Sequence, residues 1–317
     1  MYGATRAKHL ALESLCPKPE TPWVRWNKVT LVGVGLLGGS LGLALRKGRL
    51  ADSVVGFVRR AASVTECKRV GAVDWATCDL GSAVKGAQLV VLCTPIRQMR
   101  PLVERLLPGL DPGTIITDVG SVKAEVVDGL EELVAKSGVH FVGSHPMAGA
   151  EKTGVAAARP ELFANTICIV TPTRRSNRAA LRRVEQLWRG IGSRVIRLSP
   201  ELHDRLVSRS SHLPHVVAAG IANFVLAPGS PRAQSELCAN GFRDTTRVAS
   251  GSPEMWRDIA LANRENLLEA IGQFMTGLRE FERALARRDE RAISRFFERA
   301  KRRRDNWSRG ATSGSPE

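Results

Sequence analysis

The side chains best suited to proton transfer in this sequence are a histidine and a serine in the first half of the chain. His145 lies in the segment 144–149 (SHPMAG), and Ser121 lies in the segment 118–123 (DVGSVK). Histidine exchanges protons near neutral pH and therefore suits a general base. Serine is also a common helix N-cap, so Ser121 could cap a helix, face a ligand, or do both.

A second set of polar side chains lies further along the chain. Ser211, His212 and His215 fall within five residues, and Pro214 separates the two histidines. A zinc site would need further ligands, and no third one is evident, so we predict no metal. Arg247 follows, and an arginine can hold a carboxylate through two hydrogen bonds. The alternative role for this arginine is a surface salt bridge.

A glycine-rich segment indicates dinucleotide binding. Gly33, Gly35 and Gly38 form the pattern G-x-G-x-x-G between an apolar run at 29–32 and a helical segment at 36–47. The first glycine permits a tight turn, the second lets a pyrophosphate approach the backbone, and the third lets helix and strand pack closely. The start of the helix would then offer free N–H groups to the anion. The alternative is a glycine cluster with a structural role only.

The residues after the second predicted strand bear on the choice of dinucleotide. NAD sites usually carry Asp or Glu there, but this chain has Val58 followed by Arg59 and Arg60. Because arginine suits a 2′-phosphate, we predict NADP in preference to NAD. Alternatively, the arginines are an exposed helix start and NAD binds without the acid. The predicted cofactor site consists of Gly33, Gly35, Leu36, Leu37, Gly38, Arg59, Arg60, Thr94 and Pro95.

The elements that must position these residues are strands alternating with helices. Apolar strand candidates lie at residues 29–32, 54–58, 88–94, 114–119, 140–143, 166–170 and 194–198. Apolar strands between helices indicate a parallel sheet covered on both faces. We therefore predict an α/β, Rossmann-type, doubly wound parallel sheet over residues 28–199. Ligands of such sheets lie beyond the carboxyl ends of the strands, where His145 is expected.

Beyond residue 199 the sequence shows helical patterns and no convincing strand. The segment 203–226 looks helical with an interruption at Pro214, and apolar residues mark one helix face over 254–287. We predict an all-α second domain over residues 200–307, whose apolar stripe is core or a dimer surface. The predicted remainder is a poorly ordered leader, 1–27, and a disordered tail, 308–317.

Composition limits the other functions open to the chain. Its 317 residues suffice for two domains. A net charge of +16 allows nucleic-acid binding, but aromatic content is 5% and no recognition motif is present, so we predict no nucleic-acid partner. Without a long apolar run or a secretory signal, we predict no membrane span. Six cysteines without a C-x-x-C pair favour reduced thiols in a cytoplasmic protein.

Taken in order, these segments resemble the prephenate/arogenate dehydrogenase family of tyrosine biosynthesis. The resemblance extends from about residue 29 to residue 270, and its two histidine-bearing segments are far more specific than the glycine loop. The matching segments are residues 33–40, 118–123, 143–154, 203–204, 211–215, 241–247 and 255–258. The resemblance implies a Rossmann domain followed by a helical dimerisation domain, a homodimer, and an active site in the cleft between the domains.

The resemblance also implies roles for single residues. His145 would bond the ring hydroxyl of the substrate and take its proton as hydride leaves, and Ser121 would assist at that hydroxyl. Arg247 would bind the ring carboxylate. The other implied substrate-site residues are Ser211, His212, His215 and Trp256, with Trp256 contributed across the dimer.

The implied reaction is oxidative decarboxylation of prephenate to 4-hydroxyphenylpyruvate with hydride transfer to NAD(P)+. Arogenate, which differs in its side chain, stays open as an alternative substrate. A dehydrogenase of the 3-hydroxyacid type would need a lysine in the helical domain, and residues 199–278 contain none. A nucleotide-sensing protein without turnover is the non-enzymatic alternative. Because the helical pattern ends near Trp307, we expect no separate tyrosine-binding domain.

Overall fold

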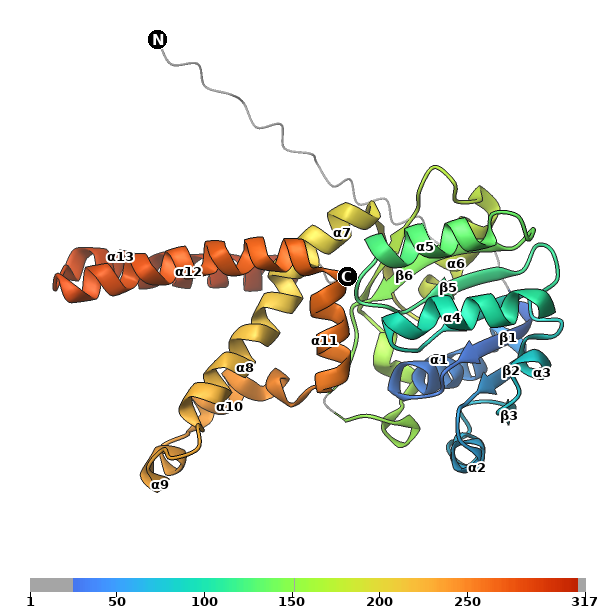
Figure 1. The fold of residues 1–317 in the computed structure, drawn as a ribbon, viewed down its shortest axis with the longest axis horizontal. Helices are drawn as coiled ribbons and strands as arrows, with labels where there is room; N and C mark the ends of the chain where they lie inside the picture. The colour runs from blue at the N-terminus through green and yellow to red at the C-terminus, as the bar shows by residue number, and fades with distance from the viewer. Residues whose placement is uncertain (1–24, 151, 313–317) are drawn as a thin grey trace, which may run out of the picture.

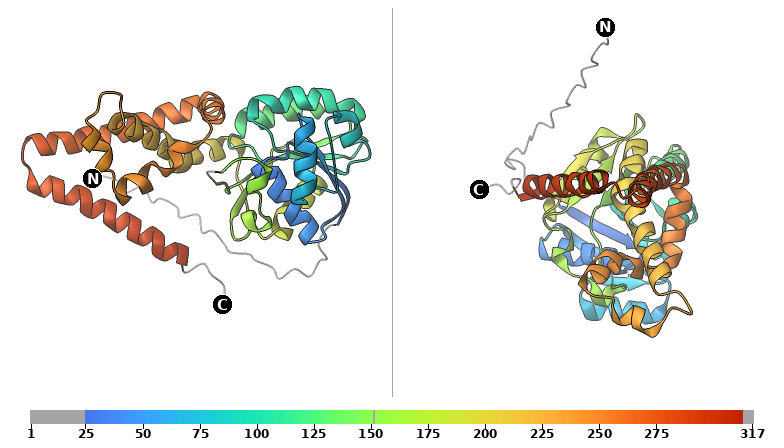
Figure 2. Two further views of the ribbon diagram at one scale, coloured as in Figure 1. Left: turned by 90° about the horizontal axis from the view of Figure 1, so that it is seen from below. Right: turned by 90° about the vertical axis from the view of Figure 1, so that its left-hand side faces the viewer.

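The computed structural model describes residues 25–150 and 152–312, which form a sheet domain followed by a helical domain (Figure 1). A hairpin of two long helices, α12 (Arg264–Ala286) and α13 (Glu290–Thr312), projects away from the sheet domain. Figure 2 shows the same hairpin from two further sides. In the described part of the chain, no helix is long and apolar enough to cross a membrane.

The sheet follows the order β3-β2-β1-β4-β5-β6-β7-β8. Its strands are β1 (Trp26–Val32), β2 (Ala51–Phe57), β3 (Trp75–Thr77), β4 (Leu89–Leu92), β5 (Ile115–Asp118), β6 (His140–Pro146), β7 (Ile167–Thr171) and β8 (Arg194–Arg197). The first six are parallel, whereas β7 pairs antiparallel with β6 and parallel with β8. The predicted Rossmann-type sheet is thus confirmed, except that its last two strands run the opposite way.

Helices connect the parallel strands and cover the sheet (Figure 1). They are α1 (Leu36–Lys47), α2 (Ala61–Val70), α3 (Leu80–Val84), α4 (Ile96–Leu106), α5 (Ala124–Val134) and α6 (Arg178–Gly190). The sequence did not predict β3 or α3, because three and five residues are too short to show a clear period. Strand β1 begins at Trp26, two residues before the predicted start of the domain.

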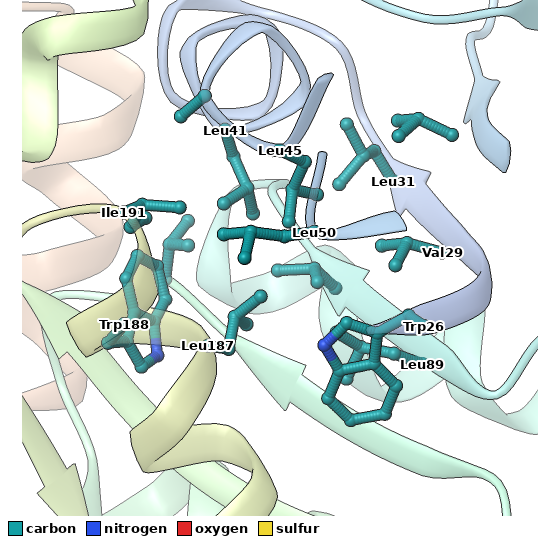
Figure 3. Packing of buried hydrophobic residues seen from close by; sticks show 14 of the residues in the cluster. Trp26, Val29, Leu31, Leu41, Leu45, Leu50, Leu89, Leu187, Trp188 and Ile191 are labelled. Carbon is teal, nitrogen blue, oxygen red and sulfur yellow. The ribbon is translucent and has the colours of Figure 1, made fainter. Parts of the chain in front are cut away.

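The core beneath one face of the sheet joins distant segments of the chain. Trp26 and Leu31 of β1 pack with Leu41 of α1, and Leu187 and Trp188 of α6 complete the cluster (Figure 3). Trp188 also donates its indole N–H to the Ser144 hydroxyl of β6 at 3.1 Å. The core therefore supports the strand that carries His145.

The helical domain begins where the sheet ends. Its elements are α7 (Pro200–Val207), a π-helical turn (Ser208–His212), α8 (Leu213–Val225), α9 (Arg232–Glu236), α10 (Asn240–Thr246), a 3₁₀ turn (Arg247–Ser250), α11 (Pro253–Ala262), α12 and α13. The helix is not interrupted at Pro214 as predicted: Pro214 lies in the first turn of α8, and the irregular π-helical turn comes just before it. A proline is tolerated in the first turn of a helix, where its missing N–H has no intrahelical partner to lose.

Two expectations for the second half differ from the structure. The single helical stripe over residues 254–287 belongs to two helices, α11 and α12, with Asn263 between them. Helix α13 continues to Thr312, so the tail predicted from residue 308 is wrong for residues 308–312. The Ser308 hydroxyl donates to the Arg304 carbonyl at 3.1 Å within this helix. The predicted leader lies mostly in residues 1–24, outside the described residues.

Candidate active site

The carboxyl ends of the parallel strands bring the predicted cofactor and proton-transfer residues to one edge of the sheet. Strand β1 leads to Gly33, β4 leads to Cys93, and β5 and β6 end at Asp118 and Pro146. The strand order reverses between β1 and β4. In open sheets of this kind ligands bind at that reversal, because the connections diverge there and leave a crevice.

The glycine loop has the geometry that its sequence predicts. Gly33 has φ +97°, and a Cβ there would lie 2.7 Å from the Cys93 carbonyl oxygen. A Cβ at Gly38 would lie 2.1 Å from the Gly33 carbonyl oxygen, so only glycine allows this close packing. At Gly35 a Cβ would meet nothing within 4 Å, which leaves the backbone open to a ligand.

The groups around this loop fit a phosphate-bearing dinucleotide. Helix α1 starts at Leu36 and Leu37 without a side-chain cap, so its first N–H groups can receive an anion. The buried Thr94 hydroxyl has no hydrogen-bond partner among the described residues, and Pro95 beside it precedes α4. The residues present therefore fit the predicted cofactor.

Arg59 and Arg60 are exposed and follow β2 after one intervening residue, Val58. Val58 is buried, and its backbone N–H donates to the Thr77 carbonyl at 3.0 Å. Arg60 is the N-cap residue of α2, so both arginines stand at the end of the strand where a ribose is bound in Rossmann folds.

A chain of three buried polar side chains crosses from β6 to α7. The Nδ1 atom of His145 lies 2.8 Å from Nε2 of His203, and Nδ1 of His203 lies 2.7 Å from Oδ1 of Asp204. All three side chains are buried. The sequence predicted His145 as a site residue but gave no role to His203 or Asp204.

The hydrogen-bond partners determine which nitrogen atoms carry the protons in this row of three side chains. A carboxylate only accepts, so the Nδ1–H of His203 donates to Asp204. Neutral His203 then accepts at Nε2 from the Nδ1–H of His145, which leaves the Nε2 lone pair of His145 free to take a proton. Burial holds the pKa of His145 well below its usual value, with the nearby His203 and Lys123 adding to the effect. Burial likewise lowers the pKa of His203.

Asp204 also joins the helical domain to the sheet domain. Its two carboxylate oxygens accept the backbone N–H groups of Lys123 at 2.7 Å and Ala124 at 2.9 Å. Asp204 therefore caps the start of α5 from another helix, and Lys123 is the N-cap residue. The structural alternative for Ser121, that its side chain caps this helix, is wrong, because α5 starts three residues later.

Ser121 lies half-buried in the turn between β5 and α5. Its backbone is close enough to the His212 ring to act on that ring's pKa. Burial is the larger effect and lowers the pKa of His212 to about 4. The turn after β5 thus faces His212 of the helical domain.

Asn263 connects His212 to Asp204. Its amide Nδ2 donates to the Asp204 carbonyl oxygen at 2.8 Å and lies 3.2 Å from Nδ1 of His212. The His212 ring meets Trp256 edge-on, and the His215 ring stacks on Trp256 with ring centroids 3.7 Å apart. The sequence did not predict Asn263, since a single asparagine between two helices carries no distinctive signal.

Three other predicted substrate-site residues occupy the helical domain. Ser211 is half-buried in the π-helical turn, and its carbonyl accepts the Nδ1–H of His215 at 2.9 Å. Arg247 is exposed on the 3₁₀ turn that packs against α8, the helix of His215. Trp256 contacts His212 and His215 of its own chain. Its contribution across a dimer stays a prediction.

In the described part of the chain, no group of three or more His, Cys, Asp or Glu side chains is arranged to hold a metal ion. The site residues are instead hydrogen-bonded to one another. The arrangement can bind a dinucleotide beside a neutral histidine that accepts a proton.

Fold and site together define a Rossmann-type oxidoreductase with a histidine proton acceptor and an appended helical domain. Residues 41–197 match the family model described as prephenate dehydrogenase, nucleotide-binding domain. Residues 199–299 match the model described as prephenate dehydrogenase, dimerization domain. The chain belongs to the prephenate dehydrogenase family.

Individual relatives agree with this assignment. The chain is 36% identical to a prephenate dehydrogenase of Bacillus subtilis, over 88% of this chain and 76% of that protein. The structure of prephenate dehydrogenase from A. aeolicus, in complex with hydroxyphenyl propionate and NAD+, superposes with a TM-score of 0.83 at 32% identity. That match covers 88% of this chain and 98% of the other. Synechocystis arogenate dehydrogenase superposes with a TM-score of 0.74 at 29% identity, over 88% and 99% of the two chains.

Proposed function

We propose that this protein catalyses the oxidative decarboxylation of prephenate to 4-hydroxyphenylpyruvate, with hydride transfer to NADP+ or NAD+. The observation that carries the proposal is His145 at the end of β6, held in one tautomer by the buried His203–Asp204 pair. Its relatives of B. subtilis and A. aeolicus are named prephenate dehydrogenases. A bound nicotinamide dinucleotide would accept the hydride from ring carbon C4.

In this mechanism His145 handles the hydroxyl proton of the substrate. Its Nε2 lone pair accepts the proton as the C4–H hydride leaves, which favours the ring carbonyl. The ring carboxylate then leaves as CO₂, and the proton returns to the oxygen of the aromatic product. His203 and Asp204 stabilise the transient imidazolium, since the Nδ1–H of His145 points to a ring that is itself bound to a carboxylate.

The remaining predicted residues would bind the substrate. We assign Ser121 to the ring hydroxyl, Arg247 to the ring carboxylate, and Ser211 and His215 to the side chain. Orientation of a bound substrate contributes several kcal/mol to catalysis in general. Burial lowers the pKa of His215, so its ring is neutral at pH 7. Because its Nδ1–H is donated to the Ser211 carbonyl, the ring offers a hydrogen-bond acceptor at Nε2. His212 and Trp256 would complete this wall of the site.

Two finer assignments accompany the proposal. Arg59 and Arg60, with no acid at Val58, favour NADP+ over NAD+, because guanidinium groups bind a 2′-phosphate. The helical domain would form a homodimer, as its match to a dimerization domain and its exposed apolar side chains suggest. Arogenate remains the alternative substrate, since an arogenate dehydrogenase shares this fold over most of its length.

The deciding experiment follows the absorbance of reduced nicotinamide in four mixtures: prephenate or arogenate, each with NAD+ or NADP+. Turnover of prephenate with NADP+ in preference to the other three supports the proposal in full. A preference for arogenate, or for NAD+, replaces the corresponding finer assignment. If folded protein that binds the nucleotide gives no increase in absorbance in any of the four mixtures, the proposed reaction is rejected.

A further inference from the structure

The side chain of Lys123 is fully buried behind the site, at 0% exposure. Its ammonium group pairs with the carboxylate of Asp118, which is also at 0% exposure. Lysine is almost never fully buried unless it is paired, and a buried ion pair seldom adds net stability over well-packed apolar side chains. The position of this pair therefore calls for a reason other than stability.

The carboxylate of Asp118 holds the strand end that carries His145. Its Oδ1 accepts the backbone N–H of Ser144 at 3.0 Å, and its Oδ2 accepts the backbone N–H of Gly120 at 2.8 Å. Parallel pairing between β5 and β6 ends at Thr117 and Val142. Asp118 thus replaces the missing backbone partner of β6 one residue before His145.

The side chain of Lys123 runs along the face of β6 that carries the imidazole. A Cβ at Gly143 would lie 3.6 Å from Cδ of Lys123. Side chains two residues apart in a strand point to the same face, so Gly143 and His145 share that face. The backbone N–H of Lys123 also donates to Asp204, at the far end of the histidine chain. One residue therefore contacts both the strand end and the carboxylate that orient His145.

The charged and titratable groups around His145 come from several elements. His203 and Asp204 lie on α7, His212 on the π-helical turn, Asp118 at the end of β5 and Lys123 in the turn after it. Burial is the main cause that lowers the pKa of His145, and His203, Lys123 and His212 add to it.

We propose that the buried Lys123–Asp118 ion pair is a positioning device for His145. Its carboxylate fixes the strand end that carries the imidazole, and its ammonium holds that carboxylate in place. The role of His145 as base rests on the proposed function, whereas the contacts of the pair do not. The pair keeps the imidazole at the position from which it accepts a proton.

The test compares the wild-type protein with two variants. Lys123→Met removes the charge and leaves Asp118 unpaired, so it could fail to fold. The double variant Asp118→Asn/Lys123→Met leaves no unpaired buried charge and is the variant on which the test depends. Glu185→Gln is the matched control, because Glu185 is also a buried carboxylate. It lies on α6 and binds Arg197 of β8, away from the site.

Two readouts are measured for each folded variant. The first is kcat/KM for prephenate against pH, and the second is the NMR titration of the His145 ring, assigned with His145→Gln. The double variant removes the cation and the anion together, so it leaves the net charge near His145 unchanged. It alters the support of the strand end, because the amide that replaces the Asp118 carboxylate can accept only one of the two backbone N–H groups. We expect kcat/KM to fall by about tenfold or more across the pH range, because a displaced base reacts more slowly, and the ring resonances of His145 to move from their wild-type positions. Glu185→Gln should leave both unchanged.

The outcomes separate this inference from the proposed function. The ring titration needs no substrate, so it tests the ion pair even if prephenate is not turned over. A double variant that is folded, as judged by near-UV circular dichroism, and whose kcat/KM and His145 ring resonances match those of the wild type overturns the inference. An equal shift in Glu185→Gln would also overturn it, because the effect would then come from a general loss of stability.

Discussion

At the scale of single residues, the site depends on which nitrogen of His145 holds a proton. Asp204 can only accept, so the orientation passes through His203 and leaves Nε2 of His145 as the acceptor. Burial of all three side chains shields this arrangement from competing water. The histidine is therefore set up as a base before any substrate arrives.

His145→Ala should abolish turnover while cofactor binding persists. General bases contribute roughly 10²- to 10⁴-fold, and the hydrogen bond of the imidazole is to His203 of the helical domain. We expect kcat to fall by about 10³-fold, with the dissociation constant of the dinucleotide unchanged by calorimetry. Near-normal turnover in this variant would remove His145 from the mechanism.

The double variant Arg59→Ala/Arg60→Ala should change the cofactor preference. If these guanidinium groups bind the 2′-phosphate, their loss should raise the KM for NADP+ by about tenfold or more, since charge-assisted hydrogen bonds contribute about 1.5–3 kcal/mol. The KM for NAD+, measured on the same preparation, serves as the control. Equal changes for both cofactors would show that the arginines do not discriminate between them.

The buried histidines also make stability depend on pH. The pKa of His212 is about 4 in the folded state and about 6.5 when unfolded, so below pH 6.5 the unfolded chain binds the extra proton. Stability from this residue is complete above pH 6.5 and is lost as the pH falls toward 4. Between pH 7.5 and pH 5 the loss is about 2 kcal/mol. Urea unfolding of His212→Gln at both pH values should show a smaller loss than the wild type, and an identical loss would contradict this account.

At the scale of elements, α7 and α5 meet through one carboxylate. Asp204 on α7 accepts two N–H groups at the start of α5 and also binds His203. A helix cap supplied by a different helix ties the two domains together at the point where the histidine chain crosses between them. The stability of α5 and the orientation of His145 are thereby coupled.

Asp204→Asn should therefore lower both stability and activity. The amide keeps one acceptor and loses the charge, so we expect a loss of about 1–3 kcal/mol in unfolding free energy together with a fall in kcat. Ser199→Ala is the matched control, because Ser199 caps α7 at Leu202 N–H and has no contact with His203 through its hydroxyl. It should lower the unfolding free energy by about 1 kcal/mol with kcat unchanged. Loss of kcat in both variants would mean that cap stability alone accounts for the activity.

At the scale of the whole molecule, the helical domain exposes apolar side chains that a second copy could cover. Phe224 of α8 is 84% exposed, and Leu268 and Leu285 of α12 are 60% and 58% exposed. These helices project from the sheet domain (Figure 2). Scattered exposed apolar residues are normal, but this set lies within the match to a dimerization domain.

We expect the protein in solution to have twice the 34.4 kDa mass of one chain. Leu268→Glu should shift it toward the monomer, because a carboxylate cannot be buried against an apolar partner surface without a large cost. Light scattering after size exclusion measures the mass. Trp75→Ser is the control, since Trp75 is an exposed apolar side chain of the sheet domain and should leave the mass unchanged. A monomeric wild-type protein would contradict the expectation.

The sequence by itself determined the sheet and its glycine loop. Apolar strands between helices and the spacing of Gly33, Gly35 and Gly38 depend on local geometry, which the order of residues encodes directly. The same applies to His145, whose place after a buried strand puts it at the ligand edge of the sheet.

Only the tertiary structure decided how the site is completed. His203, Asp204 and Asn263 lie far from His145 in the sequence. His203 meets His145, Asp204 binds His203 and Asn263 binds Asp204, because α7 packs against α5 and α12 packs against α7. The sequence likewise did not determine that β7 pairs antiparallel with β6. A short apolar strand has the same residue pattern whether it pairs parallel or antiparallel. Contacts between distant segments depend on how whole elements pack, and no local pattern of residues carries that information.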